Sequence, residues 1–174
     1  MDPRRIWCLS CCAILLAGLI GFAQSVPNIN ISAPAFAPGK PIPARYAYKG
    51  QNISPELRIG NVPENAKSLV LIVDDPDSPS GLWTHWLVWN LSPTTTIIPE
   101  GKLPMGAREG KNSFGHVRYD GPAPPSGTHR YFFHLSALDT TLSLPAGSSR
   151  DALVEAMQGH VVAYGLTIGV YSAQ

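Results

Sequence analysis

The chain has 174 residues, of which 44% are hydrophobic and only 14% are charged, and its formal net charge is +1. This length and composition suit one globular domain with a substantial core. A net charge near zero, without a basic run, argues against nucleic acid as a partner. Glycine and proline are abundant, at 16 and 17 residues, but they are scattered without a repeat, which argues against a disordered chain.

The N-terminus has the pattern of a secretory signal peptide. Two arginines precede an almost unbroken apolar run over residues 6–22, and the small residues Ala23 and Ser25 provide a cleavage site. We therefore predict a signal peptide at residues 1–25, a single mature domain at residues 26–174, and a periplasmic or secreted location. The apolar run approaches the length that spans a bilayer, so a membrane anchor formed by an uncleaved N-terminal segment is the alternative.

All three cysteines lie within this N-terminal segment. The predicted mature domain therefore contains no disulfide, no thiol nucleophile and no zinc–thiolate site. The segment also carries two arginines and one aspartate, so the remainder has 11 basic and 11 acidic side chains and a net charge of zero. An export signal on a cysteine-free domain fits a bacterial periplasmic or secreted protein.

The rest of the chain predicts a mostly β structure. Residues 26–66, rich in proline, glycine and asparagine, favour edge strands and loops. Continuous or alternating apolar residues predict strands over residues 69–73, 85–91, 131–138 and 161–171. A helix is predicted over residues 149–158, with Ser148 or Ser149 as its N-cap and Gly159 after its end. Many short strands and one late helix favour an antiparallel β-sandwich.

Two polar clusters follow or flank the predicted strands. The first comes directly after the apolar run 69–73, with three aspartates within residues 74–77, and Trp83 and His85 a few residues further on. The second is a glycine- and proline-rich stretch at residues 115–131 that carries histidines, an arginine and tyrosines. Charged side chains on proline-stiffened loops beside a buried strand form a site more often than a spacer. Imidazole, phenol and backbone N–H groups are the donors that a small oxyanion requires.

The first cluster contains Asp75-Pro76-Asp77-x-Pro79 followed by His85-Trp86, and the second contains Gly121-Pro122-x-Pro124-Pro125-x-Gly127-x-His129-Arg130-Tyr131. These two motifs resemble those of the phosphatidylethanolamine-binding protein family. Three further segments resemble its bacterial branch, the Raf kinase inhibitor-like proteins: Asn52-Ile53-Ser54-Pro55, Val62-Pro63 and Ala156-Met157-Gln158-Gly159-His160. The similarity runs from about Ile53 to Val170, which is nearly the whole predicted mature domain.

The resemblance implies an antiparallel β-sandwich of two sheets, with a Greek-key-like arrangement, one or two short helices, and a small anion pocket at one end. Members of the family bind phosphate-like groups there, including the head group of phosphatidylethanolamine. By motif position, the residues that would line the pocket are Asp75, His85, His129 and Tyr131. The residues that would shape its wall are Trp83, Gly121 and Pro124, and those that would brace the two loops are Asp77 and Arg130.

The predicted function is therefore non-enzymatic binding of a small phosphoryl or other oxyanion ligand, such as a phosphorylated small molecule or a phospholipid head group, without a cofactor. Asp75 would repel a bound anion unless one of the two carries a proton or a histidine is charged. We therefore expect the affinity for a phosphomonoester to rise as the pH falls through the histidine range.

Other functions use the same residues. Catalysis is disfavoured because neither Ser78 nor Ser126 lies in a nucleophile-elbow context and the aspartates show no division into acid and base. A metal site built from Asp75, His85 and His129 is chemically possible, but the resemblance implies none, and none is predicted. The alternative function is a protein-interaction inhibitor of a kinase or protease in the cell envelope.

Several polar residues also have purely structural interpretations. His85 and His129 could each be a core histidine satisfied by the backbone, but their positions in two proline-braced loops favour a site. Asp74 is expected to cap a turn. Arg130 is expected to form a buried ion pair across the two loops.

Overall fold

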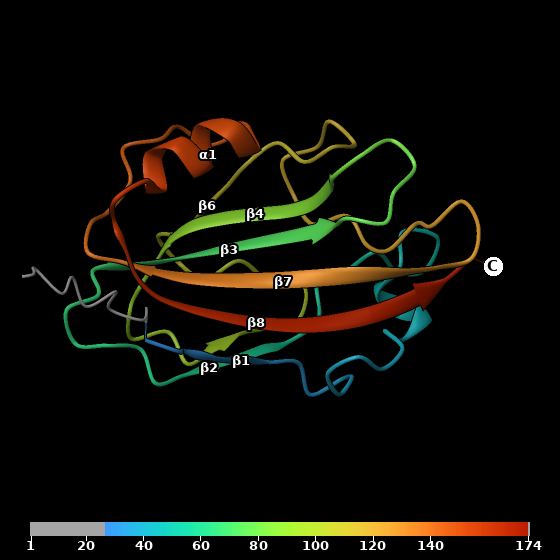
Figure 1. The fold of residues 1–174 in the computed structure, drawn as a ribbon, viewed down its shortest axis with the longest axis horizontal. Coiled ribbons are helices and arrows are strands. Elements are labelled where there is room, and N and C mark those ends of the chain that lie inside the picture. Colours follow the sequence, from blue (N-terminus) through green and yellow to red (C-terminus); the bar gives the residue numbers. More distant parts are fainter. Residues whose placement is uncertain (1–26, 174) are drawn as a thin grey trace, which may run out of the picture.

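The computed structural model describes residues 27–173, which form two antiparallel β-sheets packed face to face and one α-helix (Figure 1). The predicted mostly-β sandwich is therefore confirmed. The predicted signal peptide lies outside the described residues. Within the described part of the chain, no helix is long and apolar enough to cross a membrane.

The larger sheet has the strand order β6-β4-β3-β7-β8, and the smaller sheet has the order β1-β2-β5. The larger sheet consists of β3 (Ser68–Asp75), β4 (Trp83–Leu91), β6 (Arg108–Glu109), β7 (Thr128–Leu138) and β8 (Val161–Ser172). The smaller sheet consists of β1 (Asn30–Ser32), β2 (Leu57–Gly60) and β5 (Ile97–Ile98). The chain passes from β3 to β4 and β6 and then returns to place β7 on the other side of β3, which is a Greek-key order.

Strand β3 is buried on both faces, which explains its unbroken apolar sequence. Leu71 and Val73 point toward the smaller sheet and pack in the main core. Val70 and Ile72 point the other way and pack against Leu153 of the helix α1 (Arg150–Met157). In Figure 1, α1 lies over one face of the larger sheet, and β1 and β2 lie under the other. The larger sheet is thus the middle layer of the molecule.

Helix α1 begins where the sequence predicts. Ser149 is its N-cap, and the Ser149 hydroxyl accepts the N–H of Ala152 at 3.2 Å. The first helical residue, Arg150, reaches the end of β3 and donates to Asp74 Oδ2 from Nη2 at 2.9 Å. Asp74 is 1% exposed and also accepts the hydroxyl of Thr84 at 2.7 Å. The expectation that Asp74 caps a turn is therefore wrong, because this carboxylate anchors the helix to the sheet.

Candidate functional site

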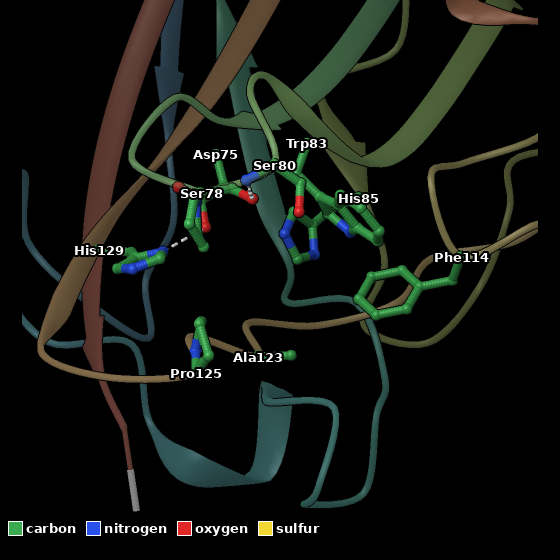
Figure 2. A pocket seen from close by; sticks show the side chains of 10 residues that line it. Asp75, Ser78, Ser80, Trp83, His85, Phe114, Ala123, Pro125 and His129 are labelled. Atoms are coloured by element: carbon green, nitrogen blue, oxygen red, sulfur yellow. Dashed lines mark hydrogen bonds and ion pairs between the residues drawn. The ribbon is translucent and has the colours of Figure 1, made fainter.

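A hollow of about 200 Å³ opens at one end of the larger sheet, where β3 ends and where β4 and β7 begin. Strands β4 and β7 flank β3 and run antiparallel to it, so residues that are distant in sequence meet at this end of the sheet. Figure 2 shows the side chains around the hollow. They belong to Asp75, Ser78, Pro79, Ser80, Trp83, His85, Phe114, Ala123, Pro125 and His129.

A β-bulge in β4 positions His85. The register of the β3–β4 pair shifts between Val73 and Asp74, so that His85 has no residue opposite it in β3. Bulges re-aim a side chain and free backbone groups from the ladder. The carbonyl of His85 accepts the N–H of Asp120 at 3.1 Å, outside the sheet. The imidazole points into the hollow (Figure 2).

The ring of His85 is held in one tautomer. Its Nδ1 lies 2.7 Å from the carbonyl oxygen of Asp120, and because a carbonyl only accepts, Nδ1 must carry the proton. The side chain is 2% exposed. Burial lowers the pKa of His85, and the Asp120 carbonyl and the charge of Asp75 only partly oppose this effect. His85 is therefore neutral at pH 7, with Nε2 as an acceptor.

His129, the second histidine of the hollow, is paired with Asp75. His129 Nδ1 lies 2.7 Å from Asp75 Oδ2, and both side chains are largely buried. The other oxygen of Asp75 accepts the N–H of Asp77 at 2.8 Å, which closes a tight turn at the end of β3. Each carboxylate oxygen of Asp75 thus has one protein donor and retains capacity to accept a further hydrogen bond.

The loop between β6 and β7 is fixed by a buried carboxylate that the sequence does not single out. Asp120 is 0% exposed. Its oxygens accept Asn52 Nδ2 at 2.8 Å, Asn112 Nδ2 at 2.8 Å, His116 Nδ1 at 2.7 Å and Arg118 Nε at 3.3 Å. Burial by itself would raise the pKa of Asp120, but the donors of Asn52, Asn112 and His116 lower it below its ordinary value. This network holds the carbonyl that orients His85.

Gly121 and Pro124 lie behind the wall of the hollow and do not line it. The N–H of Gly121 donates to Asn52 Oδ1 at 2.7 Å. A Cβ on Gly121 would overlap the carbonyl oxygen of Tyr46 and lie 2.8 Å from the carbonyl carbon of Ala47, so the position requires glycine. Pro124 lines a neighbouring cavity on the other side of the same loop.

Tyr131 lies beneath the hollow and outside its lining. It is 1% exposed, and its ring contacts the His85 ring edge to face at a centroid distance of 5.1 Å. Its hydroxyl is buried without a hydrogen-bond partner among the described residues. Burial raises the pKa of Tyr131, and the negative charge of Asp75 adds to the shift, so the phenol stays protonated. The structure therefore places a buried, protonated phenol next to Asp75 at the candidate site.

The brace between the two loops is an exposed ion pair. Arg130 donates to Asp77 in a bidentate arrangement, with Nη2–Oδ1 at 2.7 Å and Nε–Oδ2 at 2.8 Å. The hydrogen bonds from Arg130 lower the pKa of Asp77 to about 2. The side chains are 56% and 27% exposed, so the expectation of a buried pair is wrong. Exposed pairs of this kind contribute little to stability, because water and salt screen the two charges.

Phe114 forms part of the wall and was not predicted. Its ring stacks on Tyr48 at 4.8 Å and meets the ring of Trp83 edge to face at 5.3 Å. Its backbone N–H donates to Asn112 Oδ1 at 3.0 Å, which shapes the turn that carries it. The sequence carries only the signal of this turn, because nothing local shows that Phe114 faces a strand end far away in sequence.

Comparison with known proteins identifies the class of protein. The family described as phosphatidylethanolamine-binding protein matches residues 32–172, so this chain belongs to that family. A UPF0098 protein from Methanothermobacter thermautotrophicus is 49% identical over 148 residues, which cover 82% of this chain and 98% of that protein. A UPF0098 protein from Chlamydia trachomatis is 44% identical, with the same coverage.

Solved structures give the same result. The homologue of phosphatidylethanolamine-binding protein from Chlamydia trachomatis, CT736, has a TM-score of 0.81 and 43% identity, and the match covers 84% of this chain and 99% of that chain. YbcL from E. coli, described as a member of the mammalian family, has a TM-score of 0.78 and 31% identity, with the same coverage. The family resemblance of the sequence is therefore confirmed.

Proposed function

We propose that this chain is a non-catalytic binding protein whose hollow accepts a small phosphoryl or other oxyanion group, carried by a phosphorylated small molecule or a phospholipid head group. The observation that carries the proposal is the convergence of His85 and the Asp75–His129 pair on one small hollow. The name of the family supports phosphoryl chemistry, since phosphatidylethanolamine contains a phosphate group.

The lining combines donors with a rigid wall. The hydroxyls of Ser78 and Ser80 can donate to a bound oxygen, and His129 can do so through Nε2 only when its ring carries both protons, because Nδ1 is committed to Asp75. Proline and aromatic side chains form much of the remaining surface, so a ligand immobilises few flexible groups when it binds.

The geometry supports binding over catalysis. The Asp75–His129 pair resembles the acid–base half of a hydrolase triad. The described residues, however, include no hydroxyl that is hydrogen-bonded to His129, and the hydroxyl of Ser78 instead accepts the N–H of Ser80 at 3.3 Å. A nucleophile needs a base within hydrogen-bond reach. The non-enzymatic function therefore stays our proposal.

Thermal unfolding with phosphoethanolamine tests the proposed function. At about 100 times its dissociation constant, a ligand that binds only the native state stabilises it by about 2.7 kcal/mol, which raises the Tm by several degrees. We expect this shift for the wild type and its loss in His129→Ala. The matched control is His160→Ala, which removes another histidine–aspartate pair, His160 with Asp139, exposed and at the opposite end of β7.

Two results would contradict the proposal: no phosphoryl compound shifts the Tm of the wild type, or the His129→Ala variant responds as the wild type does. Capture of a protein partner, which would test the alternative of a kinase or protease inhibitor, becomes the next experiment after a negative result. We also propose a periplasmic or secreted location, on the basis of the apolar N-terminal segment, and the N-terminal residue of the exported protein tests it.

A further inference from the structure

The candidate site presents hydrogen-bond acceptors as well as donors to its ligand. Since Nδ1 of His85 donates to the Asp120 carbonyl, the free nitrogen Nε2 carries a lone pair. This nitrogen has no hydrogen-bond partner within the described residues and retains contact with solvent. Asp75, which also lines the hollow, is a second acceptor. An oxyanion without hydrogen atoms would place its oxygens against these lone pairs.

The charge of the lining also argues against a fully ionised oxyanion as the ligand. Neither lysine nor arginine occurs among the residues that line the hollow in the described part of the chain. The lining has one carboxylate, and its two histidines are each committed through Nδ1, one to a carbonyl and the other to that carboxylate. The arrangement therefore has little positive charge to neutralise a dianion, and burial of an uncompensated charge is costly.

Resting on the proposed function, we propose that the site selects oxyanions that carry their own hydrogen-bond donor, such as hydrogen phosphate or a singly protonated phosphomonoester, and discriminates against isosteric anions without a donor. The ligand's P–OH would donate to His85 Nε2 or to Asp75, while its unprotonated oxygens would accept from the serine hydroxyls. A phosphate ester with an adjacent ammonium satisfies the same acceptors.

This assignment gives the expected pH dependence a different origin. The dianion of a phosphate monoester takes up one proton near pH 6, and that proton supplies the donor that the acceptors require. The groups that face His85 are Asp75 at the end of β3, Tyr131 and His129 on β7, and the Asp120 carbonyl of the loop. The affinity for a phosphomonoester is expected to rise as the pH falls because the ligand itself becomes protonated.

Methyl phosphate and methyl sulfate are the matched probes. At pH 5.5 both are mainly singly charged and have nearly the same shape, but only methyl phosphate has an O–H group. Isothermal titration should show methyl phosphate binding at least about tenfold more tightly, because one hydrogen bond to a charged group corresponds to about that factor or more. In His85→Phe, which replaces the imidazole with an apolar ring, the ratio of the two affinities should fall.

The outcomes are distinct. Equal binding of the two anions would overturn the selectivity while leaving the proposed function intact. If neither anion binds, the proposed function fails and the selectivity fails with it. If ethanolamine alone binds more tightly than methyl phosphate, the acceptors serve a cation and the proposal is wrong. Titrations with inorganic phosphate and with phosphoethanolamine distinguish the two sources of the ligand, because the first probe is a free anion and the second is a head group.

Nitrogen NMR provides a test that needs no variant. Long-range ¹H–¹⁵N correlation of the wild type at pH 7 reports which imidazole nitrogen carries the proton. We expect His85 to be protonated at Nδ1 alone. A proton on Nε2 would place a donor in the hollow and would overturn the proposal directly.

Discussion

Replacing Asp120 with asparagine tests whether the buried network holds the loop and His85 in place. The carboxylate of Asp120 is fully buried, and each of its oxygens receives two donors. An asparagine keeps one oxygen and places an NH₂ group where the other oxygen was. In either orientation of the amide, two of the four donors that contacted Asp120 face the NH₂ group, which is itself a donor. Asp120→Asn is thus a change of charge and polarity with almost no change of volume.

The size of the expected loss in the free energy of unfolding follows from those two lost hydrogen bonds. Hydrogen bonds to a charged group contribute about 1.5–3 kcal/mol each. The side chains of His116 and Arg118 are 42% and 58% exposed, so their donors can return to water and their contributions are discounted. We therefore expect Asp120→Asn to lower the free energy of unfolding by about 2–4 kcal/mol. Urea denaturation at pH 7 measures it as a lower midpoint with an unchanged slope.

The pH dependence of this difference provides an internal check. The folded pKa of Asp120 lies below its ordinary value of 3.8, so its stabilisation is present above about that pH and is lost as the pH falls through the folded pKa. The difference between the two proteins should therefore be constant from pH 5 to 8 and shrink in stronger acid. The control is Asp139→Asn, in an exposed pair with His160. A loss below about 0.5 kcal/mol in Asp120→Asn would refute the reasoning.

Two further predictions concern the same region. Gly121→Ala should lower the Tm by several degrees, because its Cβ would overlap backbone atoms of Tyr46 and Ala47, and overpacking typically costs about 1–3 kcal/mol. Because burial lowers the pKa of His85 in the folded state, the unfolded chain takes up that proton first, so native stability should fall as the pH drops from about 6.5 toward the folded pKa. Urea midpoints at pH 7.5 and pH 5.5 measure this, and His85→Gln should flatten the dependence.

Each of these predictions has a matched control. Gly60→Ala is the control for Gly121, since a Cβ at Gly60 would meet its nearest atom at an ordinary 3.8 Å. Equal melting temperatures for the two alanine variants would contradict the packing explanation. His160→Ala is the control for His85, because its ring is half exposed. An unchanged slope of stability against pH in His85→Gln would show that the buried imidazole does not carry the effect.

The sequence predicts the elements whose residues have a regular period. The alternation over residues 131–138 identifies the core of β7, and the serine cap identifies the start of α1. The proline-rich segment 26–66 has no such period, and the smaller sheet that it largely forms could be predicted only as edge strands and loops. Strands β5 and β6 have two residues each, too few for any periodicity to show.

The candidate site was predictable where a motif is local and unpredictable where contacts cross the chain. Asp75, His85 and His129 belong to two local motifs, and they meet at one end of the larger sheet. The partner of Asp120, Asn52, lies 68 residues earlier, and no local pattern links the two. The expectation for Asp74 is wrong for the same reason, because its partner Arg150 follows it by 76 residues.

The neighbouring residues Asp74 and Asp75 serve opposite sides of one strand. Asp74 anchors helix α1 on one face, and Asp75 pairs with His129 beside the hollow on the other. A pleated strand cannot shift one residue without shifting the next. Substitutions that retune ligand preference are thus less disruptive in the loops around Ser78–Ser80 and Ala123–Pro125 than at the end of β3. The end of β3 is therefore the part of the candidate site that tolerates least change, and the two loops are the parts that tolerate more.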